Sequence, residues 1–300
     1  MSRGERGRRT YRSFAKVNLH LQVVGKRGDG YHELRTVFQT IDLHDLVSLE
    51  LGGDGVRLEI LEGPADVPAG GGNLAVRAAA AFCESFALRP GVRIGLHKRL
   101  PLGGGLGGGS SNAATVLRGL RDLLGVPEGL RDLVPLARDL GADVPYFLVG
   151  GSALGSGRGD EVVALQELPE TELWLALSPL QVSTAEVFAD LGPVTPRAVA
   201  EEVLAWAQGS PPPDLRAAAF WNDLETPVRR RYPSLDQVYN RLVEAGGRPV
   251  RLSGSGATIW ALFPSREVAD GAARKLPAGT RLLPARTLSR LASAARAVAD

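Results

Sequence analysis

The sequence predicts an α+β protein of two lobes, and three observations lead to that fold class. Short runs of alternating apolar and polar residues recur in the first half, as in half-buried strands. Capped helical patterns interrupt them at irregular intervals, unlike the strict strand–helix alternation of a doubly wound fold. Strand and helix signals start again after a break near residues 155–170. We therefore expect one lobe at residues 1–160 and a second at residues 161–300.

Four strands and one helix are expected before residue 100. The strand patterns occupy residues 17–23, 46–51, 56–60 and 92–96. The segment Gly52-Gly53-Asp54-Gly55 predicts a hairpin turn between the second strand and the third. Asn73 suits the N-cap of a helix that ends near Phe86.

A second helix is expected after a glycine-rich segment that ends near residue 110. Ser110 or Ser111 is the predicted cap, because an apolar stripe at helical spacing begins just behind them. Gly125 is expected to end this helix. The later elements are predicted in this order: a helix at 130–140, a strand at 172–177, a helical region at 196–208, a helix at 235–245, strands at 250–252 and 258–263, a helix at 267–275 and a terminal helix at 288–298.

Composition is that of a soluble globular protein. Of the 300 residues, 44% are hydrophobic and 23% are charged, and the net charge of +2 gives no reason to expect nucleic acid as a partner. The single cysteine, Cys83, excludes an intrachain disulfide, and we expect it to be a buried structural thiol. No apolar run approaches the ~18–20 residues of a membrane helix, and no signal peptide is visible. We expect a cytoplasmic protein with a solvated, arginine-rich N-terminal tail.

The segment Pro101–Asn112 carries the strongest chemical signal. Six of the seven residues from Gly103 to Gly109 are glycine, between a predicted strand and a predicted helix. Glycine adds nothing to packing, but it allows backbone N–H groups to turn towards a ligand. The helix N-terminus behind it adds partial positive charge, so the segment predicts a phosphate-binding loop. A flexible linker is the alternative, but the run is short and lacks repeated Gly/Ser composition.

Two common nucleotide motifs do not fit this segment. A P-loop requires a lysine directly after the glycines, and none is present. A dinucleotide fingerprint can be traced through Gly103, Gly105 and Gly108, but Asp122, in the place of the ribose-binding acid, lies in the same predicted helix. An NAD-dependent oxidoreductase is therefore disfavoured.

Pro101–Asn112 resembles the phosphate-binding motif of the GHMP kinases, the superfamily of galactokinase, homoserine kinase, mevalonate kinase and phosphomevalonate kinase. Ala15–Leu19, Gly141–Pro145 and Leu252–Thr258 resemble three further motifs of that superfamily. Four ordered motifs are far more specific than any one of them. The resemblance implies a two-lobed GHMP kinase fold, with a ribosomal protein S5 domain 2-like N-terminal lobe that binds ATP, an α/β-sandwich C-terminal lobe, and the active site in the cleft between them.

The resemblance also implies the nucleotide site. ATP is the expected phosphoryl donor, with Mg²⁺ beside its phosphates. The residues implied to bind ATP are Pro101, Leu102, Gly103, Gly104, Gly105, Leu106, Gly107, Gly108, Gly109, Ser110, Ser111 and Asn112. A second glycine loop is implied to close over the phosphates, formed by Ser253, Gly254, Ser255 and Gly256. From the residues alone, this second loop could be only a hairpin. No metal ligand is assigned, and the two serines of the first loop are only possible contacts.

Lys16 and Asp143 are the catalytic residues that the resemblance implies. Phosphoryl transfer asks a protein mainly for positioning and charge stabilisation, with modest help in deprotonating the acceptor. From the residues alone, Asp143 suits a helix N-cap as well as a general base, and Lys16 suits an exposed strand edge. In the superfamily the two pair, so that the lysine orients the substrate hydroxyl.

The acceptor end is implied by two further segments. Ser13–Asn18 and Arg27–His32 resemble the branch of the superfamily that phosphorylates the 2-hydroxyl of 4-diphosphocytidyl-2-C-methyl-D-erythritol, in the non-mevalonate isoprenoid pathway. In that branch, aromatic residues at the positions of Tyr31 and Phe188 sandwich the cytosine ring, and the residue at His32 hydrogen-bonds its edge. Without the resemblance, lone rings of these types would be interpreted as structural.

Three more segments complete these expectations. Asn18 is expected near the reacting hydroxyl, and Thr184 lies in the segment Val182–Phe188 that matches the acceptor side. Trp221–Glu225 resembles a family segment to which we assign no role.

The sequence thus predicts an ATP-dependent small-molecule kinase whose substrate carries a cytidine diphosphate group. We expect a monomer or homodimer, with no nucleic-acid or membrane partner. One alternative is a GHMP kinase of the mevalonate or homoserine type, against which Tyr31, His32 and Phe188 argue. The other is a non-catalytic nucleotide-binding protein, against which Lys16 and Asp143 argue.

Overall fold

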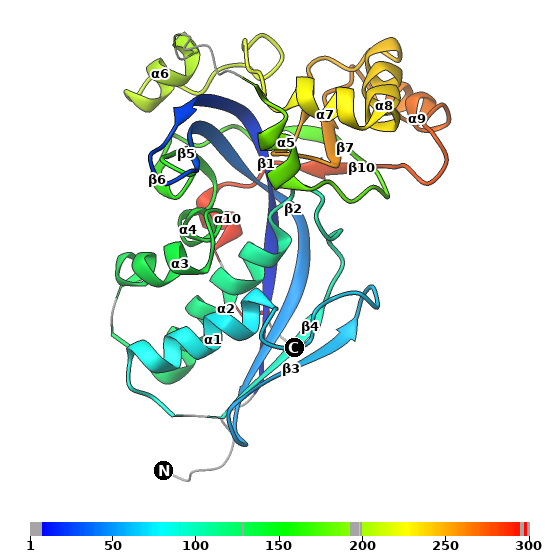
Figure 1. The fold of residues 1–300 in the computed structure, drawn as a ribbon. Helices are drawn as coiled ribbons and strands as arrows, with labels where there is room; N and C mark the ends of the chain where they lie inside the picture. Colours follow the sequence, from blue (N-terminus) through cyan, green and yellow to red (C-terminus); the bar gives the residue numbers. More distant parts are fainter. Residues whose placement is uncertain are drawn as a thin grey trace.

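The structure is a computed structural model that describes residues 8–89, 91–127, 129–192, 198, 200–294 and 297–298. Within this part of the chain, a six-stranded sheet and a four-stranded sheet lie one above the other, joined by two long curved strands (Figure 1). In chain order the strands are β1 (Arg9–Lys26), β2 (His32–Leu51), β3 (Val56–Glu62), β4 (Val92–His97), β5 (Ser152–Ser156), β6 (Glu161–Ala164), β7 (Glu172–Leu177), β8 (Val250–Leu252), β9 (Thr258–Ala261) and β10 (Arg281–Arg286).

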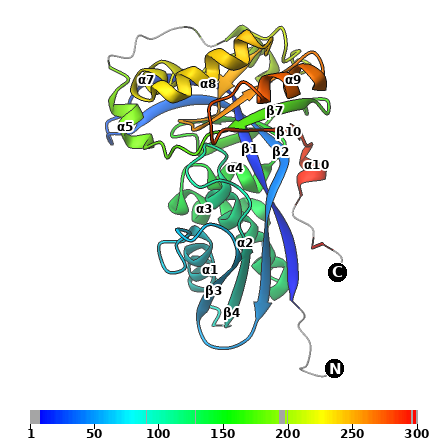
Figure 2. The same cartoon turned by 90° about the vertical axis from the view of Figure 1, so that its right-hand side faces the viewer.

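A long antiparallel hairpin of β1 and β2 organises the first sheet. The two strands pair from Arg9 opposite Leu49 to Lys26 opposite His32, with three register shifts on the way. The other edge of β2 pairs with β4 through residues 46–51 and with β5 through residues 36–39. Each register shift adds twist to the hairpin. The tip of the hairpin, where Lys26 pairs with His32, reaches the second sheet (Figure 2).

The helices of the first lobe cover one face of this sheet (Figure 2). They are α1 (Leu74–Ser85), α2 (Gly108–Leu124), the 3₁₀ helix η1 (Leu130–Leu133), α3 (Val134–Leu140) and α4 (Val144–Val149). Asn73 caps α1 by accepting the N–H of Ala75 at 2.9 Å, which confirms that prediction. Gly125 ends α2 in the left-handed conformation, as predicted.

The predicted serine cap of α2 is wrong. The helix begins at Gly108, and Gly107 is the N-cap with φ 69° and no side-chain capping bond. Ser110 and Ser111 therefore lie inside the first turn. Glycines usually weaken a helix interior, but at an N-terminus they continue the helix and leave its N–H groups uncovered.

The second lobe is an antiparallel sheet in the order β10-β7-β9-β8, with helices packed around it. These helices are α5 (Thr184–Ala189), α6 (Glu201–Ala207), α7 (Glu225–Arg231), α8 (Pro233–Glu244) and α9 (Arg266–Ala273). The strands predicted at 172–177 and 250–252 have those bounds, and the predicted helices at 235–245 and 267–275 correspond to α8 and α9. Of the region predicted at 196–208, residues 196, 197 and 199 lie outside the described residues.

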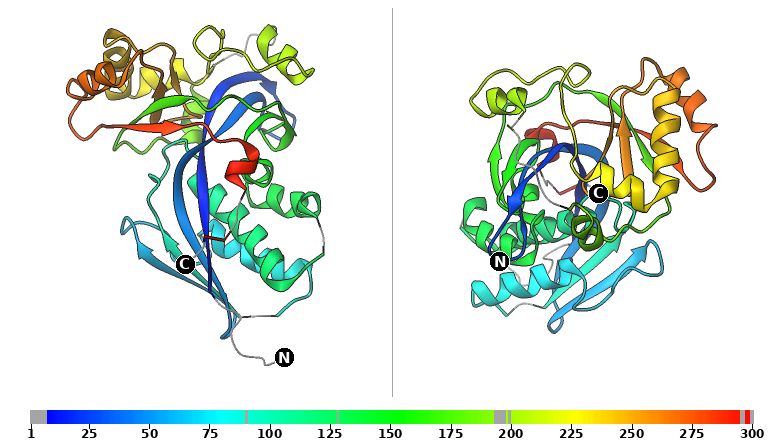
Figure 3. Two further views of the ribbon diagram at one scale, coloured as in Figure 1. Left: turned by 180° about the vertical axis from the view of Figure 1, so that it is seen from behind. Right: turned by 45° about the horizontal axis from the view of Figure 1, so that its top comes forward.

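The predicted terminal helix at 288–298 is too long: it ends at Ser293 in the described residues, and residues 295 and 296 lie outside them. Helix α10 covers only Arg290–Ser293, capped by Ser289, whose hydroxyl accepts the N–H of Ala292. Ala297 instead forms an antiparallel bridge with Tyr11 of β1. Unpaired backbone groups at a sheet edge attract such a segment. The chain after β10 therefore returns along the first sheet (Figure 3).

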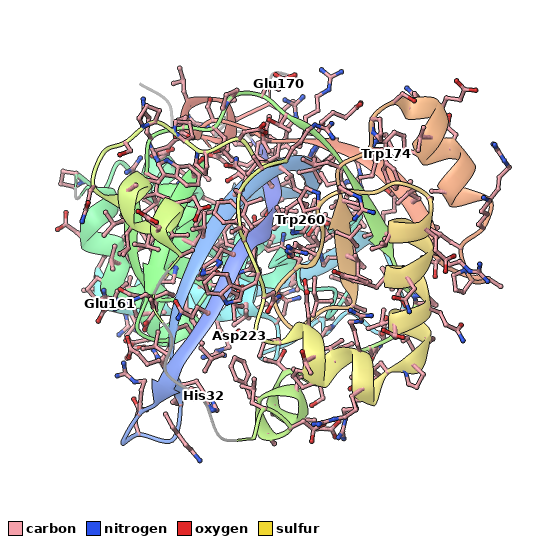
Figure 4. The ribbon with its side chains drawn as sticks, turned by 90° about the horizontal axis from the view of Figure 1, so that it is seen from above. His32, Glu161, Glu170, Trp174, Asp223 and Trp260 are labelled. Carbon is pink, nitrogen blue, oxygen red and sulfur yellow. The ribbon has the colours of Figure 1, made fainter. Side chains whose placement is uncertain are left out.

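Strand β1 belongs to the cores of both lobes. Leu19 packs in a cluster with Trp260 of β9, whereas Leu21 and Val23 pack with the core of the second lobe. Trp260 lies in the interior of the molecule (Figure 4), and its indole N–H donates to the carbonyl of Asn18 at 2.9 Å. The middle of β1 is thus fixed between the lobes. Among the described helices, none has the length and apolar surface to cross a membrane.

Candidate active site

A cavity of about 1120 Å³ opens between the lobes. Its walls come from β1, the tip of the β1–β2 hairpin, the glycine run, α2, the turn before α4, α5 and the loop between β8 and β9. The predicted site residues that line it are Lys16, Asn18, Tyr31, His32, Pro101, Leu102, Gly103, Gly104, Gly105, Gly107, Gly108, Gly109, Ser110, Asn112, Asp143, Thr184, Phe188, Gly254 and Ser255.

Four predicted site residues do not line this cavity, namely Leu106, Ser111, Ser253 and Gly256. Leu106 is buried in the core, and its carbonyl accepts the N–H of Lys16 at 3.0 Å. The hydroxyl of Ser111 donates to the carbonyl of Phe14 at 2.6 Å. Both residues support the site from behind. A direct contact between Ser111 and a phosphate or metal does not fit this position.

Lys16 and Asp143 are paired at the cavity wall. The ammonium Nζ lies 3.4 Å from Oδ2 of Asp143, and the side chains are 3% and 34% exposed. The same ammonium donates to Oδ1 of Asn18 at 2.7 Å and to the carbonyl of Gly105 at 2.9 Å. Two of its three N–H groups are thus used in hydrogen bonds, and the contact with Asp143 is an ion pair. We call Lys16, Asn18, Gly105 and Asp143 the transfer centre.

Asp143 occupies the N-cap position of α4 but does not cap the helix with its side chain. The sequence left a cap and a general base as alternatives. Pro145 stands in the first turn of α4 and has no N–H to satisfy. The carboxylate instead faces Lys16 and the cavity, where it is placed to accept a proton from a bound hydroxyl.

Two glycine loops meet at this wall, and we call residues 253–256 the closing loop. Gly105 has φ 74°, and a Cβ on it would lie 2.1 Å from the carbonyl oxygen of Ser253. The hydroxyl of Ser253 donates to the carbonyl of Gly105 at 2.9 Å. The N–H of Thr258 donates to the carbonyl of Gly104 at 3.2 Å. Glycine at 105 is therefore required by the close approach of the two loops.

The N-terminus of α2 forms an anion-binding surface. Gly108, Gly109 and Ser110 line the cavity, and no side chain caps this 17-residue helix. Uncovered N–H groups and the helix dipole both attract phosphate there. Lys98 also lines the cavity, and its ammonium lies 2.6 Å from a carboxylate oxygen of the buried Asp45.

Aromatic residues form another part of the cavity wall. The rings of His32 and Phe188 stack with centroids 5.0 Å apart and planes at 22°. Tyr31 is 57% exposed, and its ring centroid lies 5.2 Å from the guanidinium carbon of Arg158. Burial, with a smaller contribution from Lys26, lowers the pKa of His32, so the imidazole is neutral at neutral pH. We call Tyr31, His32, Arg158 and Phe188 the base wall.

The base wall differs in detail from the arrangement that the resemblance implies. His32, rather than Tyr31, is the ring stacked on Phe188. Figure 4 shows His32 at the tip of the blue hairpin, close to α5. Thr184 of α5 lies within hydrogen-bond distance of Ser255, with 2.7 Å between the hydroxyl oxygens. A cytosine held between Tyr31 and Phe188 stays a prediction.

Sequence reasoning missed Arg158 and Lys98 as cavity residues. Arg158 is held by Asp160, with 2.7 Å between their nitrogen and oxygen atoms. The rarity of lysine, with four among the 35 basic residues of the chain, is a weak signal that includes Lys98. Arginine is common in this chain, so Arg158 offered no comparable signal.

Family models match both halves of the chain. The model described as GHMP kinases N terminal domain matches residues 73–151, which contain the glycine run and Asp143. The model described as GHMP kinases C terminal matches residues 212–280, which contain the closing loop.

Curated relatives cover most of the chain. A 4-diphosphocytidyl-2-C-methyl-D-erythritol kinase of Geobacter sp. (strain M21) is 40% identical over 87% of this chain and 92% of its own length. The protein of that name from Bordetella parapertussis is 42% identical over 89% of this chain and 86% of its own length.

Solved structures show the same relationship. A crystal structure of 4-(cytidine 5'-diphospho)-2C-methyl-D-erythritol kinase matches with a TM-score of 0.75 and 38% identity, over 93% of this chain and 98% of that one. A homoserine kinase from Cytophaga hutchinsonii matches with a TM-score of 0.66 at 20% identity, over 96% of this chain and 97% of that one, and shares the fold.

Proposed function

This chain belongs to the GHMP kinases, and we propose that its interlobe cavity transfers the terminal phosphoryl group of ATP to the 2-hydroxyl of 4-diphosphocytidyl-2-C-methyl-D-erythritol. The reaction type and the acceptor rest on relatives 40% and 42% identical over most of the chain. The products are ADP and the 2-phosphate, an intermediate of isoprenoid precursor biosynthesis by the non-mevalonate pathway. We also propose that the enzyme acts in the cytoplasm, as a monomer or homodimer.

The observation that carries this proposal is the pairing of Lys16 with Asp143 beside the glycine loops. The 2-hydroxyl oxygen attacks the terminal phosphorus of ATP as its proton passes to the Asp143 carboxylate, and the bond to the ADP oxygen breaks. The Lys16 ammonium, 3.4 Å from that carboxylate, orients the hydroxyl and stabilises charge that develops on the acceptor oxygen. Asn18 holds the ammonium in place through a hydrogen bond of 2.7 Å.

The glycine run and the first turn of α2 hold the phosphates of ATP in this proposal. Gly108 and Gly109 direct uncovered N–H groups from the helix end that lines the cavity. Mg²⁺ keeps several waters and binds substrate phosphates, so we expect it to arrive with the nucleotide. Asp143 is the only carboxylate among the cavity-lining residues, and Ser110 adds a hydroxyl there. When bound, the metal would neutralise charge on the phosphates, whereas the glycine run and α2 would hold the phosphates in place.

The base wall accounts for the cytidine group of the acceptor. Stacking between a base and an aromatic ring contributes about 1–3 kcal/mol and needs flat, accessible rings such as Tyr31 and Phe188. Neutral His32 offers one donor and one acceptor nitrogen for the edge of the base. Mevalonate and homoserine have no ring to stack, so the base wall favours the cytidine compound over them.

The two lobes that we propose are residues 1–160, which carry the ATP site, and residues 161–300, of which β6 still pairs with β5 in the first sheet. The two matched family models, at 73–151 and 212–280, fall on opposite sides of this division. The cavity takes residues from both sides, including Asp143 and Phe188.

ADP release in the presence of Mg-ATP tests the proposed function. The acceptors to compare are 4-diphosphocytidyl-2-C-methyl-D-erythritol, mevalonate, homoserine and galactose. We expect turnover with the cytidine compound alone. Turnover with another acceptor only would leave the phosphate loops in their role and remove the assignment of Tyr31, His32 and Phe188.

A further inference from the structure

The segment Trp221–Glu225 has no part in the proposed reaction, yet it holds the closing loop in place. We infer that Asn222 is a positioning residue, which fixes the closing loop against the transfer centre and thereby sets the rate of phosphoryl transfer. This inference rests on the proposed function of that centre. Figure 4 shows the neighbouring Asp223 between the blue strands of the β1–β2 hairpin and the yellow helices of the second lobe.

All three polar positions of the Asn222 side-chain amide are used. The residue is buried, and its Nδ2 donates to the carbonyl of Leu252 at 2.9 Å and to that of Gly254 at 2.8 Å. Its Oδ1 accepts the N–H of Leu224 at 2.9 Å. An oxygen in place of Nδ2 would face two carbonyl oxygens and repel both. Only an amide of this length and orientation satisfies the three partners.

The segment around Asn222 is itself bonded to β1 as a short parallel bridge. The N–H of Leu21 donates to the carbonyl of Trp221 at 2.8 Å, and the N–H of Asp223 donates to the carbonyl of Leu21 at 2.9 Å. The carboxylate of Asp223 accepts the N–H of Val23 at 2.8 Å. Strand β1 also carries Lys16, so the same strand positions the catalytic cation and the holder of the closing loop.

The closing loop reaches the transfer centre directly. Gly254 has φ 57°, and a Cβ on it would lie 3.3 Å from Oδ1 of Asn18 and 3.5 Å from Nζ of Lys16. The hydroxyl of Ser253 accepts the N–H of Asn18 at 3.2 Å and donates to the carbonyl of Gly105. A displaced closing loop would therefore disturb two of the partners that hold the Lys16 ammonium.

Glu225 adds a second hold on the same stretch of backbone. Its Oε1 accepts the N–H of Leu252 at 2.9 Å, while the Nδ2 of Asn222 donates to the carbonyl of Leu252. Burial raises the pKa of Glu225 above its ordinary value. Leu252 is thus held by both of its backbone polar groups, directly before the closing loop begins.

The test compares Asn222→Asp with Asn222→Ala in the full chain. Both variants lose the two Nδ2 bonds, and we expect kcat to fall at least 10-fold while the KM of the acceptor changes less than 3-fold. In Asn222→Asp the new carboxylate faces two carbonyl oxygens, which should raise its pKa. When it is protonated, its O–H can again donate a hydrogen bond to one of them. Its kcat relative to the wild-type chain should therefore rise as the pH is lowered, whereas that of the alanine variant should stay constant.

Ser265→Ala is the matched control for a loss of stability alone. Ser265 caps α9 by accepting the N–H of Val268 at 3.3 Å and does not line the cavity. We expect a lower melting temperature and an unchanged kcat.

Three results would overturn the role of Asn222: a kcat within 2-fold of wild type in both variants, the same pH-independent ratio in both, or loss of the folded protein in both. Wild-type turnover is measured first with the four acceptors named above. Its absence would count against the proposed function and not against Asn222.

Discussion

The transfer centre and the base wall both take residues from the β1–β2 hairpin, but they are built in opposite ways. Lys16, in the middle of β1, is 3% exposed and has three oxygen partners. Tyr31, at the tip of the hairpin, is 57% exposed and is supported by the Arg158 guanidinium. A buried hydrogen-bond network holds the reacting groups, whereas ring contacts near solvent form the recognition surface.

This difference indicates how one fold can serve several acceptors. The core of the hairpin, with both glycine loops, is fixed by contacts to both lobes, so changes there should affect the chemical step. The tip carries little of the core, so it can vary without loss of the transfer centre. We expect changes in the transfer centre to lower kcat and changes in the base wall to raise the KM of the acceptor.

The largest effect is expected for Asp143→Ala. Loss of the proton acceptor and of the charge beside Lys16 should lower kcat by about 10³-fold, within the range of general-base catalysis. Affinity for a non-hydrolysable ATP analogue, measured by calorimetry, should stay within 3-fold, because the glycine run and α2 are unchanged. Loss of nucleotide binding would show that Asp143 belongs to the phosphate cradle.

Gly105→Ala comes next, and Gly125→Ala is its matched control. Both glycines are left-handed, at φ 74° and 65°, but a Cβ at 105 meets the Ser253 carbonyl at 2.1 Å, whereas one at 125 meets nothing within 4 Å. Both changes should cost about 1 kcal/mol of backbone strain. Only the first should separate the glycine loops, with a fall in kcat/KM for ATP of about 100-fold, or about 2.7 kcal/mol.

A similar kcat/KM for the two glycine variants would show that strain alone, and not the loop contact, decides their activity. Melting temperatures, measured in parallel, keep the effect on stability separate from the effect on turnover.

A smaller effect is expected for Phe188→Ala in the base wall. Loss of one stacking partner should raise the KM of the cytidine acceptor about 5- to 30-fold, or about 1–2 kcal/mol, in the lower part of the range for a stacked base. The KM of ATP and kcat should change less than 3-fold.

Arg158→Ala should have a still smaller effect, because it leaves the rings in place and removes only the guanidinium that lies over the Tyr31 ring. It should raise the KM of the acceptor about 2- to 5-fold. A drop in kcat with unchanged KM in either variant would contradict a pure recognition role.

The smallest effect is expected for Glu225→Gln. Burial raises the pKa of Glu225 in the folded state, so the folded chain binds more protons than the unfolded chain just above pH 4.5. Wild-type stability therefore falls as the pH rises through that window. Glutamine is uncharged, so it avoids the free-energy cost of ionising a buried carboxyl. The variant should therefore melt a few degrees higher than wild type at pH 8 and no higher at pH 4. A constant difference across the range would contradict the buried carboxyl.

The sequence predicted local elements better than those that depend on distant pairing. Strands β7 and β8 have their predicted bounds, and the alternating runs at 56–60 and 92–96 correspond to β3 and β4. Strand β1 extends well beyond the predicted 17–23, because three register shifts interrupt its alternation. Strand β10 and helix α5 gave no usable pattern because both are short, whereas Asp143 suited the N-cap position at which α4 begins. The prediction of a long terminal helix was wrong because Ala297 pairs with Tyr11 of β1. This tertiary contact, and not local helix propensity, determines the conformation there.

The candidate site shows the same limit. The motifs placed Lys16 and Asp143 in one site, and the structure puts them 3.4 Å apart. Neither the stack of His32 on Phe188 nor the three bonds of Asn222 can be derived from spacing. The stack, and the bonds of Asn222 to Leu252 and Gly254, join residues at least 30 positions apart in the chain, so they depend on tertiary packing.

The independence of the transfer centre and the base wall is tested most directly by kcat/KM for the acceptor in Lys16→Ala, Phe188→Ala and the double variant. Distant, independent sites give additive free energies within about 0.5 kcal/mol, or about 2-fold in rate. We expect the two single losses to multiply in the double variant within that factor. A double variant no worse than Lys16→Ala alone would show that the base wall acts through the transfer centre, and would contradict the division between chemistry and recognition on this hairpin.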